Sequence, residues 1–187
     1  MKKMLLIAIC SIICEGMSAM APPQVDLNDP ALLTFLRKNI KPEAIFRAAC
    51  KAARGNVPVL QLLRTLEPNI VNRKDEHGQN LLHHAVGAGR VDVVEELLTS
   101  RNHQVADASA PAPGAQGYTP LHMAVQLQSD KAVQIINLLI NNGGADPSIG
   151  ADGLGGDTPL DYAQSLECRD DVIALLQQAA ARRAAAN

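Results

Sequence analysis

Apolar residues recur along the chain in blocks that have the spacing of a helix face. Val93 to Leu98 carries apolar residues at i, i+1, i+4 and i+5, and similar blocks cover Ile135 to Ile140 and Val172 to Leu176. This spacing is typical of an amphipathic helix with one buried side. A shorter apolar segment precedes each block, so the pattern predicts units of helix, turn and helix.

The shorter segments are related to one another in sequence. Gly78 to Val86 aligns with Gly117 to Val125, and Gly156 to Ala163 follows the same order. One leucine takes the same place in each segment, and the three are evenly spaced: Leu82, Leu121 and Leu160. A fixed period of this kind indicates a repeat architecture, in which each helix pair buries its apolar face against its neighbours. The chain is therefore predicted to be an all-α solenoid.

Several short motifs make these units resemble the ankyrin repeat. Thr119 to His122 reads Thr-Pro-Leu-His, Asn72-x-x-Asp75-x-x-Gly78 fits the approach to a repeat, and Asn142 to Pro147 fits an exit. The resemblance implies paired antiparallel helices joined by projecting turns. It also implies that the protein acts by binding another protein and has no catalytic site.

A divergent unit precedes the clear repeats. Gly55 to Leu63 matches the inter-helix turn and second helix of the family, whereas Ala44 to Ala49 is a weaker match to the first helix. Pro30 to Asn39 is predicted as one more short helix, with Asp29 as its N-cap. Divergence of this kind is expected of a terminal capping unit.

These patterns divide the chain into eight predicted segments. They are a signal peptide (1–21), a segment with the capping helix (22–41), a degenerate repeat (42–74), a repeat (75–104), a Pro/Ala-rich loop (105–116), a second repeat (117–148), a C-terminal repeat (149–180) and a tail (181–187).

The spacing from Leu82 to Leu121, and again from Leu121 to Leu160, exceeds the family period of about 33 residues. We expect the first surplus in the Pro/Ala-rich stretch 105–115, as a mobile loop. We expect the second to be split between the inter-helix turn at Gln128 to Gln134 and the glycine-rich stretch Gly150 to Gly156. Such insertions either extend a binding face or have drifted neutrally.

Residues 1–21 have the pattern of a secretory signal peptide. Lys2 and Lys3 precede an apolar run from Met4 to Cys14, and small residues follow as far as Ala21. The run is shorter than the ~20 residues that span a bilayer, so a membrane anchor is less favoured. Lipid attachment is also less favoured, because isoleucine precedes each cysteine of the run. We expect a periplasmic or secreted protein, without stable membrane insertion after cleavage.

Composition narrows the classes of function further. The 187 residues are 47% hydrophobic, with no Trp, two Tyr and two Phe, which predicts an aliphatic core. A net charge of −2 and so few aromatics argue against nucleic-acid binding. Gly150 to Gly156 lacks the Lys-Ser/Thr of a phosphate-binding loop, and no cofactor is predicted.

The histidines raise the question of a metal. His83 and His122 take the histidine position of the family motif, which the resemblance implies is structural, tying a turn to its neighbour. Zinc binding by His77, His83, His84 and His103 is less favoured, because no Cys or carboxylate joins them at ligand spacing.

Two cysteines lie outside the signal segment. Cys50 falls in the first helix pair and Cys168 in the last, too far apart for the Cα separation of about 7 Å that a disulfide allows. Buried, inert thiols are expected. A small thiol-dependent redox protein or enzyme is the alternative function, and a purely structural spacer is another.

The resemblance also implies which residues meet a partner. In ankyrin proteins the partner contacts the tips of the projecting turns and the exposed side of each first helix. Carried to this chain, that surface comprises Glu76, His77, Gln79, Gln116, Tyr118, Gln126, Leu154, Asp157 and Gln164. Tyr118 is the leading candidate, because tyrosine often anchors interfaces and the repeat core does not require one here. We expect a monomer that binds an enzyme, a toxin or a host protein.

Overall fold

A computed structural model describes residues 30–100 and 104–185, so the signal segment and Asp29 lie outside the described residues. In this part of the chain the regular elements are helices, with two isolated β-bridges. The α-helices are α2 (Pro30–Asn39), α3 (Pro42–Ala52), α4 (Val57–Leu66), α5 (Leu81–Gly87), α6 (Val91–Thr99), α7 (Pro120–Gln126), α8 (Asp130–Asn141), α9 (Pro159–Ser165) and α10 (Asp170–Ala185). The 3-10 helices are η1 (Pro68–Asn72), η2 (Pro113–Ala115) and η3 (Asp152–Leu154).

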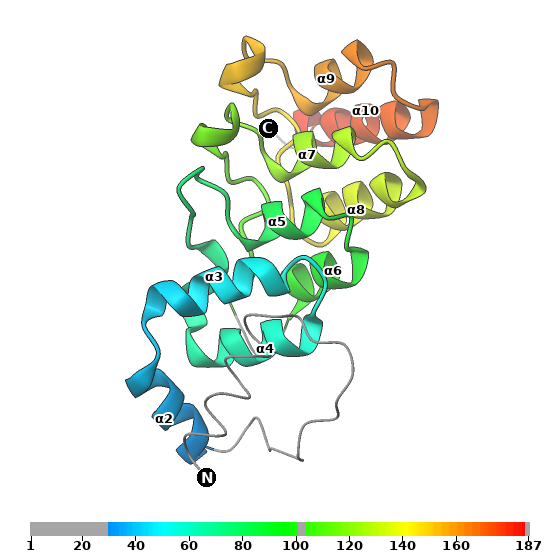
Figure 1. Cartoon of the computed structure of the whole chain (residues 1–187). Helices are drawn as coiled ribbons and strands as arrows, with labels where there is room; N and C mark the ends of the chain where they lie inside the picture. Colours follow the sequence, from blue (N-terminus) through cyan, green and yellow to red (C-terminus); the bar gives the residue numbers. More distant parts are fainter. Residues whose placement is uncertain (1–29, 101–103, 186–187) are drawn as a thin grey trace.

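The helices form pairs that stack in the order of the sequence (Figure 1). One layer consists of α3, α5, α7 and α9, each in contact with the next. The second layer consists of α4, α6, α8 and α10. Helix α2 packs on α4 at the N-terminal end, where Arg37 donates hydrogen bonds to the carbonyl oxygens of Leu66 and Thr65. This arrangement confirms the predicted all-α solenoid.

Helices α5, α7 and α9 begin with the same reciprocal cap. In each, the backbone N–H of the N-cap residue donates to the side chain at the third helical position. The pairs are Asn80 with His83, Thr119 with His122 and Thr158 with Asp161. Such capping boxes satisfy N–H groups that a helix start leaves unbonded, which stabilises these short helices. Helix α3 begins at the equivalent place in the divergent unit without a side-chain cap, and it is longer.

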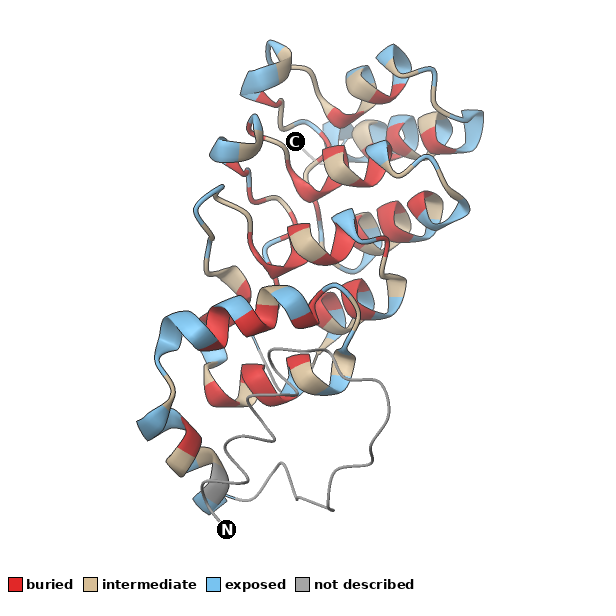
Figure 2. Cartoon of the chain, in the orientation of Figure 1, coloured by how far each residue is buried: buried red, intermediate tan, exposed pale blue. Residues whose placement is uncertain are grey.

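The core between the two layers is aliphatic, as predicted. Leucine, isoleucine, valine and alanine provide almost all of its buried side chains, and Phe46 is the one buried Phe or Tyr in the described part. Figure 2 shows the buried residues on the facing sides of stacked helices, while the projecting turns are mostly exposed. Each unit therefore depends on its neighbours to cover its apolar face.

The Pro/Ala-rich stretch differs from the mobile loop that we expected. Ala106, Ala108, Ala110 and Ala112 are all buried, whereas residues between them reach solvent. The stretch is irregular, with a turn at Ala108 and Ser109, and its alternate alanines are the side chains that pack inward. The backbone N–H of Ala106 donates to Leu97, and that of Asp107 donates to the side chain of Asn72. The segment thus lies along the stacked units with defined bonds.

The extra residues between Leu121 and Leu160 also lie partly outside the places predicted for them. The turn before α8 has three residues, the same length as the turn before α6, so residues 130–134 belong to a helix. Helix α8 is twelve residues long and α6 nine, and the extra length therefore lies in the helix. The rest of the surplus lies between α8 and α9, where the glycine-rich stretch was expected.

Candidate functional site

Three projecting turns, which we call fingers, precede α5, α7 and α9. They are the α5 finger (75–79), the α7 finger (112–118) and the α9 finger (151–157). The last two are closed by the bridges between Ala112 and Tyr118 and between Ala151 and Asp157. These two fingers repeat the same backbone hydrogen bonds, and each includes a 3-10 helix. The shorter α5 finger is closed by a bond from Asp75 N–H to the Gln79 carbonyl.

Neighbouring fingers touch through glycines. A Cβ on Gly114 would lie 2.7 Å from the Cα of His77, and one on Gly153 would lie 2.2 Å from the Cβ of Gln116. The N–H of Gly153 also donates to the carbonyl of Gln116 at 2.8 Å. Glycine permits this approach because it has no Cβ. The three fingers therefore form one continuous edge along the solenoid.

Two buried histidines tie the first helices to the next finger. Nε2 of His83 lies 3.3 Å from the Tyr118 carbonyl oxygen, and Nε2 of His122 lies 3.0 Å from that of Asp157. Because Nδ1 of each ring accepts the N-cap N–H, Nε2 carries the proton and donates. Burial lowers the pKa of His83 to about 4 and also lowers the pKa of His122, so both rings are neutral at pH 7. This confirms their predicted structural role.

The last unit has an aspartate where the others have this histidine. Asp161 closes its own capping box with Thr158, and the described part of the chain has no further finger beyond α9 for a longer side chain to reach. As for the zinc alternative, His103 lies outside the described residues. Among the residues with described positions, no group of three or more His, Cys, Asp or Glu side chains is placed to hold a metal ion.

The nine residues predicted to meet a partner all lie on fingers or first helices. The exposed ones are Glu76, His77, Gln116, Gln126 and Gln164. The half-buried ones are Gln79, Tyr118, Leu154 and Asp157. The structure brings them onto the finger side of one layer of helices, and contact with a partner stays a prediction for each.

Tyr118 packs within its own molecule, which corrects the expectation that the repeats have no use for it. Its ring stacks on His122 with centroids 5.7 Å apart and lies 5.6 Å from the ring of Tyr162. Gln126 donates a hydrogen bond to the hydroxyl of Tyr162 at 2.8 Å. Burial, with a hydrogen bond to Tyr162, raises the pKa of Tyr118 to about 12, so the phenol stays neutral.

Sequence reasoning missed Tyr162, although the repeat contains a signal for it. His84, Met123 and Tyr162 occupy equivalent positions of successive repeats, next to the motif histidine or aspartate. All three are half-buried, and His84 Nε2 lies 2.9 Å from Asp75 Oδ2 of the α5 finger. Aligning the variable positions of the repeats would have grouped these residues on one face.

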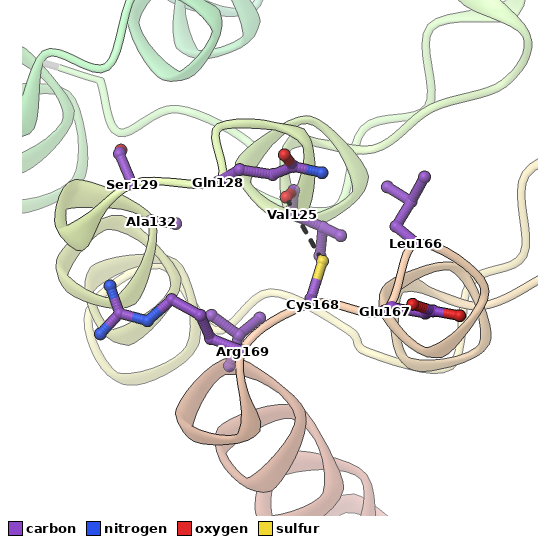
Figure 3. Close-up of a pocket in the computed structure, with 9 residues that line it drawn as sticks. Val125, Gln128, Ser129, Ala132, Leu166, Glu167, Cys168 and Arg169 are labelled. Carbon is purple, nitrogen blue, oxygen red and sulfur yellow. Dashed lines mark hydrogen bonds between the residues drawn. The ribbon is translucent and has the colours of Figure 1, made fainter.

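The two thiols lie at opposite ends of the solenoid, and both are free. Figure 3 shows Cys168 in a cavity of about 250 Å³ between the turns that precede α8 and α10, with Sγ 3.9 Å from the Val125 carbonyl oxygen. Burial raises the pKa of Cys168, and burial together with Asp75 raises the pKa of Cys50 to about 11. Both side chains are half-buried, less than expected, and thiolate is scarce at neutral pH.

Comparison with models of known protein families gives a match. The family model described as ankyrin repeats in three copies matches residues 45–151, which is more than half of the chain. No curated protein matches it. In the part of the chain that the structure covers, no helix combines the length and the apolar character needed to cross a bilayer.

Proposed function

Because the chain belongs to the ankyrin-repeat family, whose repeats mediate protein–protein interaction, we propose that it binds its partner through the finger side of α7 and α9, as a monomer. The observation that carries this proposal is the pairing of the two tyrosines of the chain. Tyr118 and Tyr162 make up half of all its aromatic residues, and they lie together, half-buried, on one surface.

The chemistry of this surface suits a protein interface. Tyrosine offers a large, rigid contact area with a polar end, and it is enriched among residues that dominate binding energy. Met123 lies in the same row of the repeat. The exposed Gln126 bonds to the Tyr162 hydroxyl, and Gln116 is exposed on the α7 finger. An apolar centre with a polar rim is the usual anatomy of an interface.

The geometry of the fingers favours binding for a second reason. Hydrogen bonds close each finger, and close glycine contacts join it to the next. A surface that is already ordered loses less conformational entropy on binding, so more of the contact energy appears as affinity. The ordered fingers are therefore a second observation, in addition to the tyrosine pair, that supports the proposal.

We further propose that this module acts outside the cytoplasm. The basic, apolar and small-residue segments of 1–21 support export, with the partner an enzyme, a toxin or a host protein. Mass spectrometry of the protein purified from its own host tests this proposal. An N-terminus near residue 22 in an extracytoplasmic fraction is the expected result, and an intact leader in the cytoplasm contradicts it.

The binding role is tested by affinity capture of the tagged full chain, expressed in its own host. Exchanging both rings, Tyr118→Ala with Tyr162→Ala, is expected to abolish recovery of a partner that the natural chain retains, because the centre of the interface is lost. Gln177→Ala with Gln178→Ala on the exposed side of α10 serves as the matched control and should retain the partner.

Circular dichroism checks that the tyrosine variant keeps its helices. Equal capture by a folded tyrosine variant and the natural chain would place the interface elsewhere. The thiol-dependent alternative makes a different prediction. If the protein acts through its thiols, Cys50→Ser with Cys168→Ser should abolish its function in the host. The raised pKa of both thiols argues against that outcome.

A further inference from the structure

Charge is strongly segregated along the solenoid, although the whole chain is nearly neutral. Residues 30–74 contain nine Lys or Arg and two Asp or Glu, a formal charge of +7. Residues 75–187 contain six Lys or Arg and fourteen Asp or Glu, a formal charge of −8. Because the units stack in sequence order, this division places positive charge at the α3–α4 end and spreads negative charge over the units from α5 to α10 (Figure 1).

The positive end carries a groove between α3 and the α5 finger. Its volume is about 580 Å³, and its lining includes Phe46 and Arg47 of α3, Arg73 and Asp75 before α5, and His84 of α5. The groove therefore lies on the same side of the helix layer as the tyrosine pair, two units away along the stack.

Several cations of this end are held by internal contacts. Arg73 lies 4.9 Å above the ring of Phe46 and 3.6 Å from the carboxylate of Glu43. Lys74 donates to the carbonyl of Pro111, and Arg64 is buried. These contacts neutralise or orient the charges on the finger side of the groove.

Arg47 and Arg54 differ from these residues. Both are exposed, Arg47 on α3 and Arg54 in the turn that follows this helix. Arg54 reaches only the ring of His84, at 3.5 Å, and Arg47 makes no hydrogen bond or ion pair with any described residue. Their positive charge is available to a ligand.

The carboxylates around the groove select the kind of anion that fits. Glu43, Asp75 and Glu76 line it together with Arg47 and Arg73. A nucleic acid presents a phosphate at every nucleotide and would meet these carboxylates, with no aromatic ring of the groove exposed for base stacking. A polypeptide can space its acidic residues to meet the arginines alone.

We propose that the α3 groove binds the acidic end of a polypeptide segment of the partner, whose next residues run along the fingers to Tyr118 and Tyr162. This inference rests on the proposed function, because it extends the same binding surface. The negative charge of the units from α5 to α10 repels the acidic end, so the segment lies in one direction only.

The test uses fluorescence anisotropy with a labelled ten-residue peptide in which single glutamates are separated by two serines, and the protein purified from a host that expresses the full chain. Arg47→Glu with Arg54→Glu is expected to weaken binding at least tenfold at 50 mM salt, and the natural protein should lose affinity as salt rises. Arg47→Lys with Arg54→Lys should stay within threefold of the natural protein.

The matched control reverses two exposed cations of the other end, Lys131→Glu with Arg182→Glu, and should leave peptide affinity within threefold. Equal binding of the peptide by the natural protein and by the variant with Arg47→Glu and Arg54→Glu overturns the inference. A ten-nucleotide DNA strand is tested in the same way. If it binds as tightly as the peptide and depends on the same arginines, the groove is a general anion site and the inference is overturned. Either failure leaves the tyrosine-dependent capture unaffected, so the two proposals fail separately.

Discussion

Two turn residues hold a backbone conformation that glycine holds in an equivalent turn. Gln128 and Glu167 have φ angles of 44° and 51°, and Gly89 has 62° at the same repeat position. A side chain in this left-handed region costs about 1–2 kcal/mol, whereas glycine is free of that cost. The turn geometry is therefore imposed by helix packing against the local preference of these two residues.

Substitution of these residues by glycine should stabilise the protein. Gln128→Gly and Glu167→Gly are each expected to raise the free energy of unfolding by about 0.5–1 kcal/mol, after the larger entropy of the unfolded glycine chain is allowed for. Gly89→Ala is the reverse control and should lower it by about 1 kcal/mol because of the positive φ angle, since a Cβ there would make only ordinary contacts. Urea titration measures all three, and a loss of stability in both glycine variants contradicts the interpretation.

At the scale of elements, the neutral histidines make finger attachment sensitive to pH. The pKa of His83 is about 4 in the folded protein, below the ordinary value of 6.5. Between these two values the unfolded chain binds more protons than the folded one, so stability rises with pH across this window. On acidification from pH 7 to pH 5, the unfolding free energy should fall by about 2 kcal/mol because of this residue.

Denaturant midpoints at pH 7 and pH 5 measure this dependence. His83→Asn should be less stable at pH 7, because the bond to Tyr118 is lost, but its midpoint should change less between the two pH values. His77→Asn is the control, because His77 is exposed on the α5 finger and its removal should preserve the natural pH dependence. An unchanged pH dependence in the His83 variant would show that other groups produce it.

The arrangement of the helices could be predicted from the sequence, whereas the packing of residues 105–115 and the tyrosine pair could not. The period of Leu82, Leu121 and Leu160 predicted the stacked pairs because burial of an apolar face fixes helix positions. The stretch 105–115 resembled a linker, since alanine has no strong preference that marks it as buried. Its alternate alanines fit against the stack because of their size, which composition alone does not show. The tyrosine pair could not be predicted either, because the contact between Tyr118 and Tyr162 depends on how the α7 finger is placed against α9.

At the scale of the whole molecule, one buried arginine joins the divergent first unit to the regular repeats. Arg64 of α4 has no exposed surface, and its guanidinium donates to the carbonyl and carboxylate oxygens of Glu96 in α6 and to the carbonyl of Gln104. Burial lowers its pKa, but the nearby Glu96 carboxylate favours the charged form. The apolar pattern of the repeats gave no indication of this residue, because it depends on groups from two other segments.

Removal of this arginine should loosen the N-terminal end of the solenoid selectively. Arg64→Ala leaves a cavity and unpaired carbonyls, and we expect the unfolding free energy to fall by about 3 kcal/mol. Because each unit contacts only its neighbours, helices α3 and α4 should then exchange amide hydrogens before α7 to α10 do. Arg90→Ala, which removes an exposed ion pair with Asp92, is the control and should leave the urea midpoint close to that of the natural protein. Uniform acceleration of exchange in all units would instead mean that the solenoid unfolds as one cooperative body and that the arginine stabilises every unit equally.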